Sequence, residues 1–471
     1  MARLVVVGAG ISGLAAAWSA HETAARAGVT LDVLVLERNG EVGGKARTIV
    51  RDGWMVEGGP SGFLGGRPEL DALLRASGLA DQVLPANAAA KRRFLFRAGR
   101  MRELRASPAA FAASGILSAG GLLRLAAEPF IPPSRDDDDE SVWAFAARRL
   151  GVEAADRLIS PMTLGVFAGD ARRLSLASAF PKRAALERDH GSLLRGMVVR
   201  RRDARVARRD ATETALTTAG HLASLRDGMQ SLPRRLARCG TLTVRCRARV
   251  RAIARTPRGW SVAVDGDGTP VDADALIIAA EPFAAAPLLR PLSAEAADAL
   301  DAIPCPPVTV VALGFDAAAS RRIPDGFGVL VSRGEGLRML GNLWETSTYP
   351  GRGPAGGVLV RALFGGGVDP AIGELDDATM LKLANREVAG LFGLTAAPAF
   401  QEVVRIARAI PQYEIGHATR IAAVERAAAA MPGLAVTGFG LRGVAFADAA
   451  ADGVRTGEMM GRRLTRNGAS A

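Results

Sequence analysis

A glycine-rich segment near the start of the chain limits its fold more than any other feature. Residues 4–7 form a short apolar run, and the pattern Gly-x-Gly-x-x-Gly follows at once with Gly8, Gly10 and Gly13. A helix-forming run begins inside this pattern. The order of strand, glycine turn and helix is typical of a Rossmann unit, in which backbone amides at the helix N-terminus bind a pyrophosphate. We therefore predict an α/β dinucleotide-binding domain at this end of the chain.

A second apolar run supports this prediction. Residues 31–36 end in Glu37, which lies 24 residues after Gly13. A carboxylate at the end of the second strand can accept hydrogen bonds from both hydroxyl groups of a ribose, and it would repel a 2′-phosphate. The spacing therefore favours a dinucleotide-binding site over a glycine turn that binds no ligand. The carboxylate favours an adenine dinucleotide that has no 2′-phosphate.

Three further segments have the composition of ligand-binding loops. Residues 38–48 contain the doublet Gly43-Gly44, residues 57–63 read Glu-Gly-Gly-Pro-Ser-Gly-Phe, and residues 438–448 follow a short apolar run close to the C-terminus. Glycines at this density let the backbone pass close to a pyrophosphate or a flat ring. The last segment also precedes an alanine-rich helix, whose N-terminus would suit a phosphate.

Together these segments resemble the glycine loops of the flavin amine oxidase and protoporphyrinogen oxidase superfamily, in which a doublet follows the ribose-binding acid. The resemblance implies FAD as the cofactor, with residues 57–63 beside the isoalloxazine. Lys45 and Phe439 stand where many members of the superfamily have other residues. The FAD-binding residues that the resemblance implies are Gly8, Ala9, Gly10, Ile11, Ser12, Gly13, Glu37, Arg38, Gly44, Lys45, Gly59, Pro60, Ser61, Gly62, Val250, Phe439, Val444, Ala445 and Phe446.

Changes in hydrophobic period along the chain predict that the domains are interleaved. Residues 64–90 have an amphipathic helical pattern, residues 106–225 are mainly helical and rich in arginine, and a β period begins with an expected strand over residues 242–253. The predicted architecture is α/β, with a Rossmann-like FAD-binding domain (residues 1–90, 227–300 and 405–471), a substrate-binding domain built on a mixed sheet (residues 91–105 and 301–404) and a mainly helical, membrane-associating domain (residues 106–226).

Segments in the middle of the chain extend the resemblance to the oxygen-dependent protoporphyrinogen oxidases. They are residues 90–94, 165–170, 174–176, 179–181, 191–196, 326–330, 339–343 and 409–417, which follow one another in the family's order. The resemblance implies FAD-dependent, six-electron oxidation of protoporphyrinogen IX to protoporphyrin IX in haem biosynthesis. The reaction would take three two-electron steps, each of which converts one dioxygen to hydrogen peroxide.

The same resemblance implies the substrate contacts. Arg93 would bind a propionate, and the backbone carbonyl of Gly165 would accept hydrogen bonds from pyrrole N–H groups. Leu330 and Leu343 would enclose a ring between them, and Leu363 would complete the apolar wall. Because the flavin carries the redox chemistry, no side chain is assigned a catalytic role.

Other activities on the same fold remain as alternatives. A coproporphyrinogen III oxidase shares most of these motifs, and its substrate with four propionates would need a wider and more basic pocket. An amine or carotenoid oxidoreductase is a second alternative, although the chain has only two tyrosines, Tyr349 and Tyr413, from which to build an aromatic amine cage. A nucleotide-binding scaffold without activity is the third.

Composition narrows the range of partners. The net charge is +12, from 60 basic and 48 acidic residues, but aromatic residues make up only 5% and no recognition motif combines them with the arginines, so nucleic acid is not expected. An anionic substrate or membrane surface accounts for the charge. Only three cysteines are present, and none of them has zinc-site spacing, so no metal site is expected.

An uncharged run over residues 106–123 bears on location. It contains one proline and three glycines, which suits peripheral contact with an anionic membrane better than a membrane-spanning helix. The N-terminus begins with the first strand and lacks the pattern of a secretory signal. We expect a cytoplasmic protein, with peripheral contact at the inner face of the cell membrane as one option and a homodimer as one possible oligomeric state.

Overall fold

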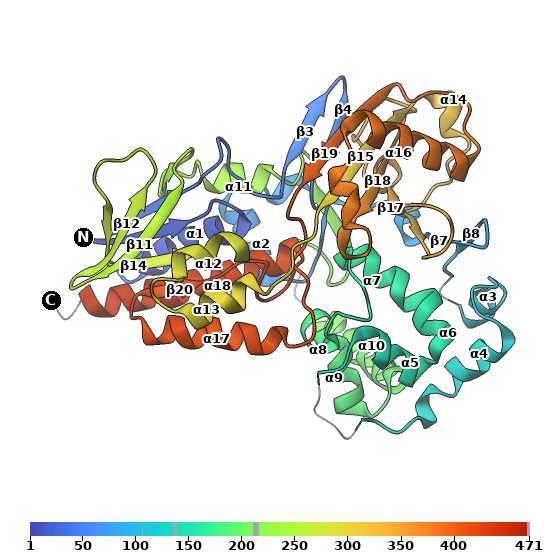
Figure 1. Ribbon diagram of the computed structural model, residues 1–471, viewed down its shortest axis with the longest axis horizontal. Coiled ribbons are helices and arrows are strands. Elements are labelled where there is room, and N and C mark those ends of the chain that lie inside the picture. Colours follow the sequence, from blue (N-terminus) through green and yellow to red (C-terminus); the bar gives the residue numbers. More distant parts are fainter. Residues whose placement is uncertain (106, 135–138, 211–215, 469–471) are drawn as a thin grey trace.

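The computed structural model describes residues 1–471 except 106, 135–138, 211–215 and 469–471. Its nucleotide-binding region is built on a parallel five-stranded sheet with the order β10-β2-β1-β14-β20 (Figure 1). These strands come from three distant stretches of the chain and are β1 (Ala2–Val7), β2 (Leu31–Leu36), β10 (Thr243–Arg245), β14 (Ala275–Ile278) and β20 (Leu434–Val436). The first strand lies in the middle, so the glycine turn that follows it lies at the centre of the sheet's carboxyl edge.

The first and last helices pack closely on each other beside this sheet (Figure 1). They are α1 (Ile11–Arg26) and α18 (Phe446–Gly468). A Cβ atom on Gly453 would lie 2.2 Å from the Ser12 carbonyl oxygen, and one on Gly457 would lie 2.2 Å from that of Ala16. Glycines at every fourth position of α18 therefore allow its backbone to touch α1, and this contact fixes the helix that begins at the last glycine loop.

The expected strand over residues 242–253 is two strands in different sheets. β10 extends the parallel sheet beside β2, whereas β11 (Val250–Thr256) begins a three-stranded antiparallel sheet with β12 (Gly259–Val264) and β13 (Val271–Ala273). Arg247, between the two strands, has a φ of 55°, which turns the chain from one sheet to the other. The prediction of one continuous strand was wrong, because the hydrophobic period of a segment does not show where the chain stops pairing with one strand and begins to pair with another.

The helical pattern over residues 64–90 is also only partly correct. This stretch contains the helix α2 (Pro68–Ala76), but β5 (Phe63–Leu64) and β6 (Val83–Pro85) pair with β9 (Leu222–Leu225) in a small antiparallel sheet. The partner strand β9 comes from far away in the sequence, so no local pattern could have shown it. The hairpin of β3 (Thr48–Arg51) and β4 (Trp54–Glu57) packs through Trp54 and Val56 against a different sheet, whereas the helix α11 (Ser231–Leu236) packs against α1.

A mixed seven-stranded sheet forms the second region, with the order β19-β15-β18-β17-β16-β7-β8. Only β7 and β16 pair in parallel, and the other neighbours are antiparallel. One face packs on helix α16 (Asp377–Phe392) through buried side chains such as Phe94, Val329 and Phe364. The strands are β7 (Arg93–Arg97), β8 (Arg100–Glu103), β15 (Val308–Phe315), β16 (Gly328–Val331), β17 (Met339–Trp344), β18 (Val358–Gly365) and β19 (Phe400–Ile406).

The third region is helical and lies below the mixed sheet in Figure 1. Its helices are α3 (Pro108–Ala112), α4 (Ala119–Ala126), α5 (Val142–Leu150), α6 (Val152–Ala154), α7 (Ser160–Phe167), α8 (Leu176–Ala179), α9 (Pro181–His190) and α10 (Leu193–Asp210), with a π-helical turn η4 (Ala155–Ile159) before α7. The uncharged run predicted for membrane contact becomes α3 and part of α4, and its first residue, 106, lies outside the described residues. No helix among the described residues has the length and apolar character needed to cross a membrane.

Shorter elements connect these regions. Helices α12 (Pro282–Leu289), α13 (Ala294–Asp301) and α17 (His417–Ala430) cover the nucleotide-binding sheet, while α14 (Ala317–Ser320) and α15 (Glu345–Thr348) contact β15 and β18 of the mixed sheet, respectively. The single-turn 3-10 segments are η1 (Ala80–Gln82), η2 (Ala88–Lys91), η3 (Glu128–Phe130), η5 (Gly366–Val368) and η6 (Pro370–Glu374).

Candidate active site

The glycine loops predicted to bind FAD lie together at the carboxyl edge of the parallel sheet. The Gly43 amide donates to the Ala9 carbonyl at 2.9 Å, and Gly10 and Gly43 form a parallel β-bridge. A Cβ atom on Gly59 would lie only 2.0 Å from the Lys45 carbonyl oxygen. The first loop, the doublet and residues 57–63 therefore form one backbone surface.

The three glycines of the first loop have different surroundings. Gly8 has a φ of 104°, and a Cβ atom on Gly13 would lie 2.0 Å from the Gly8 carbonyl oxygen, so both glycines are required by the turn and by the contact between helix and strand. A Cβ atom on Gly10 would meet no protein atom within 4 Å. Open space at Gly10, beside the N-terminus of α1, fits a pyrophosphate that approaches the backbone. The residues present therefore fit a bound dinucleotide.

Glu37 has a structural role that the sequence did not reveal. It is 5% exposed, and its carboxylate accepts hydrogen bonds from the backbone amides of Ala9 at 2.8 Å and Asn39 at 2.9 Å. Its own carbonyl accepts from the Ala248 amide at 2.8 Å, which brings the start of β11, with Val250, beside the second strand. The same carboxylate predicted to bind a ribose therefore also holds the first glycine loop in place.

We expect Glu37→Ala to weaken FAD binding by about 10- to 150-fold, which corresponds to loss of about 1.5–3 kcal/mol of charge-assisted hydrogen bonding. Titration of the apoprotein with FAD measures the change. Glu41→Ala is the control, because Glu41 lies in the same stretch of chain but its side chain is 69% exposed and pairs with Arg234. Equal FAD affinity for the Glu37 variant and the wild type would contradict the assignment.

Lys45 connects the doublet to two distant segments. Its Nζ atom lies 2.5 Å from Glu281 Oε1, 2.5 Å from the Ala409 carbonyl oxygen and 4.2 Å from the centre of the Phe439 ring. Burial lowers the pKa of Lys45, and the nearby Glu281 carboxylate partly offsets this effect. Arg38 lies further out, 3.9 Å from Glu281. Neither Glu281 nor Ala409 was predicted, since only the folded chain brings them to Lys45.

The last glycine loop is held by an aromatic pair at the start of α17. Tyr413 Oη accepts a hydrogen bond from the Gly443 amide at 2.9 Å and donates one to the Phe439 carbonyl oxygen. The Tyr413 ring stacks on His417 with a centroid distance of 3.9 Å, and His417 Nε2 lies 3.0 Å from the Leu441 carbonyl oxygen. The predicted residues Val444, Ala445 and Phe446 continue from this loop into α18, and the Phe446 ring lies 6.5 Å from that of Phe63.

His417 predicts a pH dependence. Burial lowers its pKa to about 4, against the smaller effect of the hydrogen bond to Leu441. Because the histidine of the unfolded chain takes up its proton near pH 6.5, we expect stability that is present above pH 6.5 to be lost as the pH falls toward 4. The loss would be on the order of 3 kcal/mol in all. Urea unfolding at a series of pH values measures it, and His417→Gln should show a flatter profile; identical profiles for variant and wild type would refute the assignment.

A buried network of charges joins the loop of residues 57–63 to the mixed sheet. Arg361 on β18 donates from Nη1 to the carbonyl oxygens of Glu57 at 2.5 Å and Gly59 at 2.7 Å, and its Nε lies 3.0 Å from Glu345 Oε1. Arg352 lies 3.5 Å from Glu57 Oε1, and burial raises the pKa of Glu57. The four charged side chains of this network are at most 4% exposed. Sequence reasoning did not identify any of them as charged contacts of the site.

The remaining predicted residues of this loop also contact buried backbone. The Ser61 carbonyl accepts a hydrogen bond from Ser224 Oγ at 2.7 Å, and a Cβ atom on Gly62 would lie 2.5 Å from the Ala223 carbonyl oxygen. Pro60 lies between Gly59 and Ser61. The small sheet of β5, β6 and β9 therefore supports this loop through its strand β9.

The register of the mixed sheet brings the predicted substrate residues to one face. Arg93 pairs with Gly328, Gly328 with Leu343, and Leu330 with Gly341, which pairs in turn with Leu363. Side chains alternate between the two faces of a strand, so Arg93, Leu330, Leu343 and Leu363 share the face opposite α16. These four positions lie on four different strands, and only the pairing of those strands brings them together.

Helix α7 lies against this face. A Cβ atom on Gly165 would lie 2.7 Å from Leu330 Cδ2, so the absence of a side chain leaves a close contact between helix and sheet. Leu164 belongs to a buried apolar cluster that includes Ala409, with Leu363 packed against it. Since Lys45 contacts the Ala409 carbonyl, this cluster connects the predicted substrate wall to the FAD loops. Arg93 is exposed, and its guanidinium lies 5.3 Å from the Phe327 ring.

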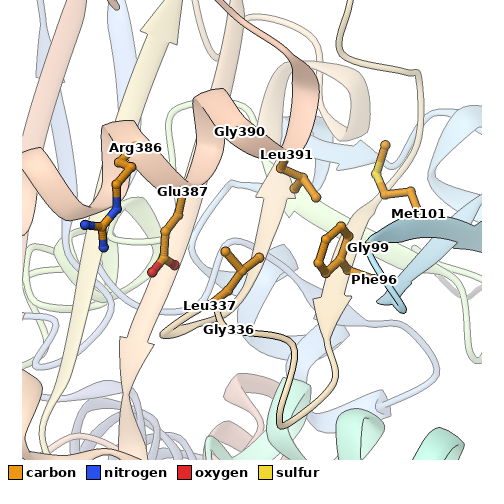
Figure 2. Close-up of a pocket in the computed structure, with 9 residues that line it drawn as sticks. All are labelled: Phe96, Gly99, Met101, Gly336, Leu337, Arg386, Glu387, Gly390 and Leu391. Atoms are coloured by element: carbon orange, nitrogen blue, oxygen red, sulfur yellow. The ribbon is translucent and has the colours of Figure 1, made fainter.

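A separate cavity of about 400 Å³ lies on the other side of the mixed sheet (Figure 2). Phe96, Met101, Leu337 and Leu391 line it, and Glu387 holds the adjacent loop by accepting from the Met339 amide at 2.9 Å. Because Phe96 is on the face that packs toward α16, this cavity is distant from the predicted substrate wall. In the part of the chain that the structure describes, no group of three or more His, Cys, Asp or Glu side chains could hold a metal ion.

Comparison with known proteins identifies the class to which this fold and site belong. The family model described as flavin containing amine oxidoreductase matches residues 11–457, so the chain belongs to that family and its cofactor is FAD. A crystal structure from Exiguobacterium sp. 255-15, provisionally assigned as a protoporphyrinogen oxidase, superposes with a TM-score of 0.83, 23% identity and coverage of 98% of this chain and 99% of that one. At this identity the superposition shows a shared fold.

Relatives define the group within the family. The chain is 30% identical over 457 residues to "Coproporphyrinogen III oxidase" of Bacillus subtilis, with 95% of both chains covered. It is 32% identical over 449 residues to "Protoporphyrinogen oxidase, chloroplastic" of rice, with 90% of this chain and 81% of the relative covered. The protein is a flavin-dependent oxidoreductase of the protoporphyrinogen and coproporphyrinogen oxidase type.

Proposed function

We propose that the protein oxidises a porphyrinogen to the corresponding porphyrin. The substrate loses six electrons and six hydrogens in three steps, and three molecules of dioxygen are reduced to three of hydrogen peroxide. Bound FAD would supply the two-electron acceptor for each step. The shared face of the mixed sheet carries this proposal, because it combines an apolar wall, an arginine and a helix glycine next to the FAD loops.

Residues of this face would bind and orient the macrocycle. Leu330, Leu343 and Leu363 would supply an apolar surface to a large ring. Gly165 lies in the last turn of α7, where helix carbonyl groups lack an amide partner within the helix and are free to accept from pyrrole N–H groups. Arg93 would pair with a propionate at the exposed start of β7 and so fix the orientation of the ring.

Two substrates are candidates. The sequence predicts protoporphyrinogen IX, the substrate type in the names of the plant relatives. Coproporphyrinogen III is supported by the names of two bacterial relatives, those of Bacillus subtilis and Propionibacterium freudenreichii, the second of which is 31% identical with 96% of this chain covered. Identity does not separate the two groups, since the values for both lie near 30%.

Porphyrin fluorescence provides the test. The purified protein, loaded with FAD, is incubated in air with protoporphyrinogen IX, with coproporphyrinogen III and with a primary amine as a control substrate. We expect porphyrin fluorescence and three hydrogen peroxide per porphyrin with at least one of the two porphyrinogens. Peroxide production with the amine alone would refute the proposal.

We expect Arg93→Ala to raise the KM for the porphyrinogen about 10- to 100-fold, because a carboxylate would lose a charge-assisted pair worth about 1.5–3 kcal/mol. FAD content should not change, since Arg93 lies on the substrate side. Lys91→Ala is the matched control on the same exposed stretch. Unchanged kinetics would remove Arg93 from the site, and loss of FAD would make it a structural residue.

A further inference from the structure

A second cavity lies at one end of the proposed substrate wall. Its volume is about 350 Å³, and it lies between the end of β7, the residues after β16 and the segment from η4 through α7. Leu164, the neighbour of Gly165, lines it together with Arg97 and Ser332. Arg97 has the same parity on β7 as Arg93, so both arginines are on the face where Leu330 lies. The cavity therefore lies on the same face of the mixed sheet as the proposed site, and it shares no lining residue with the cavity in Figure 2.

The charge of this cavity favours an anion. Four arginines and two aspartates line it. Three of the arginines have a carboxylate partner: Arg157 pairs with Glu153, Arg172 with Asp156 at 3.2 Å and Arg333 with Asp170 at 3.6 Å. Arg97 forms no ion pair with any residue that the structure describes. Burial, together with the positive charge of Arg97, lowers the pKa of Arg157, so an anion between the two guanidinium groups would relieve their repulsion.

A buried hydroxyl in the same cavity also lacks a partner. Ser332 is 5% exposed, and among the described residues its Oγ atom has no hydrogen-bond partner. A buried polar group without a partner is costly and uncommon, so it indicates that a ligand or water completes the site. An unpaired hydroxyl and an arginine without a carboxylate, both at the end of an apolar wall, have the chemistry of a carboxylate-binding subsite.

From these observations we propose that the cavity lined by Arg97 and Ser332 binds propionate carboxylates at the end of the macrocycle remote from Arg93, so that the preferred substrate has four propionates. This proposal rests on the porphyrinogen oxidation proposed above. Arg93 and Arg97 are about 13 Å apart along one face of β7, so the carboxylates that they bind must come from different parts of one large ligand. Coproporphyrinogen III carries a propionate on every ring, whereas protoporphyrinogen IX carries propionates on two adjacent rings only.

The test compares the two porphyrinogens with the FAD-loaded wild type, Arg97→Met, Ser332→Ala and Arg100→Met. Arg100 is the control, since it lies on the same hairpin but not in the cavity. We expect Arg97→Met to raise the KM for coproporphyrinogen III about 10- to 100-fold and that for protoporphyrinogen IX less than about threefold. Ser332→Ala should act in the same direction with a smaller effect, and Arg100→Met should have none.

A binding measurement separates failure of this proposal from failure of the proposed function. Tryptophan quenching would report binding of coproporphyrin III, with four propionates, and mesoporphyrin IX, with two. Arg97→Met should weaken only the first, whether or not the wild type turns over. Suppose that the wild type oxidises porphyrinogens but that Arg97→Met affects both substrates and both porphyrins equally. This result would overturn the subsite and leave the oxidase proposal standing. Absence of turnover with either substrate would overturn the oxidase proposal, and equal loss of both porphyrins would then overturn the subsite as well.

Discussion

Replacing Arg149 with methionine is expected to destabilise the helical region by about 3–5 kcal/mol, the usual cost of removing one partner of a buried ion pair. Arg149 and Glu128 are both 0% exposed. Arg149 also donates to the Ile131 carbonyl at 2.7 Å, and Glu128 accepts from Ser192 Oγ at 2.7 Å and from the Leu193 amide at 2.9 Å. The variant would leave a carboxylate without its counter-charge in the interior, beside the start of α10.

Urea unfolding of the FAD-loaded protein measures this effect. Arg148→Met is the matched control, because the neighbouring Arg148 is 30% exposed and pairs with Glu140 and Glu187 nearer the surface. The double variant Arg149→Met with Glu128→Leu should recover part of the loss, since no lone charge remains buried. A single variant that is as stable as the wild type would show that Glu128 is neutral or that water reaches the pair.

The pH dependence of Glu128 provides a second measure of the same pair. Burial opposes its ionisation, but hydrogen bonds from Ser192 and Arg149 and from backbone amides outweigh burial and lower the pKa of Glu128. A carboxylate whose pKa is lower in the folded state stabilises that state above the pKa of the unfolded chain, and this stability is lost as the pH falls. The stability that this pair gives the helical region should therefore be present above the pKa of a free glutamate carboxyl and be lost as the pH falls through the lowered pKa of Glu128.

Local patterns in the sequence were sufficient to predict the nucleotide-binding region. The first strand, the glycine turn and the second strand ending before Glu37 all depend on short-range rules of turn chemistry and period. In each of these cases the residues that determine the structure are neighbours in the sequence.

Contacts between distant segments could not be predicted in this way. Arg361 reads as an ordinary polar position in a strand, and nothing near it in the sequence shows that it donates to the Glu57 and Gly59 carbonyls. The pairing of β9 with β5 and β6 failed for the same reason. One long-range contact did have a signal, because the glycines at 453, 457 and 461 mark a helix face that touches backbone, and this spacing was not recognised.

The candidate site combines both kinds of information. The glycine loops could be named because they have local sequence patterns, whereas Arg93, Leu330, Leu343 and Leu363 were named only through a family resemblance. The structure supplies the physical relation among these four residues, which is the shared face of a mixed sheet. Arg97 and Ser332, which line the proposed carboxylate subsite, were not predicted, because an arginine in a basic stretch and a serine after a strand have no distinctive local pattern.

Replacing Arg361 with methionine is expected to separate the mixed sheet from the FAD loops. The guanidinium binds the Glu57 and Gly59 carbonyls with one nitrogen and lies 3.0 Å from Glu345 with another, and it is 4% exposed. Methionine keeps the apolar stem but leaves Glu345 buried without this counter-charge, at a cost of about 3–5 kcal/mol in unfolding free energy. The loop of residues 57–63 would also lose its anchor, so FAD should dissociate more readily from the variant that remains folded.

Two measurements on the same samples separate these effects, namely FAD bound per folded protein and the urea midpoint. Arg361→Lys should keep a charge near Glu345, but a single ammonium group cannot reach both Glu345 and the two carbonyls, as the guanidinium does with two nitrogens. The variant should therefore recover stability more than FAD retention. Arg405→Met on β19, the edge strand of the same sheet, is the control, because Arg405 pairs with the exposed Asp377 and should contribute less than about 1 kcal/mol. If Arg361→Met binds FAD as tightly as the wild type while its urea midpoint falls, the arginine stabilises the sheet alone. Loss of FAD from Arg361→Lys at nearly unchanged stability would instead show that the position of the loop, and not the strength of the core, controls cofactor binding.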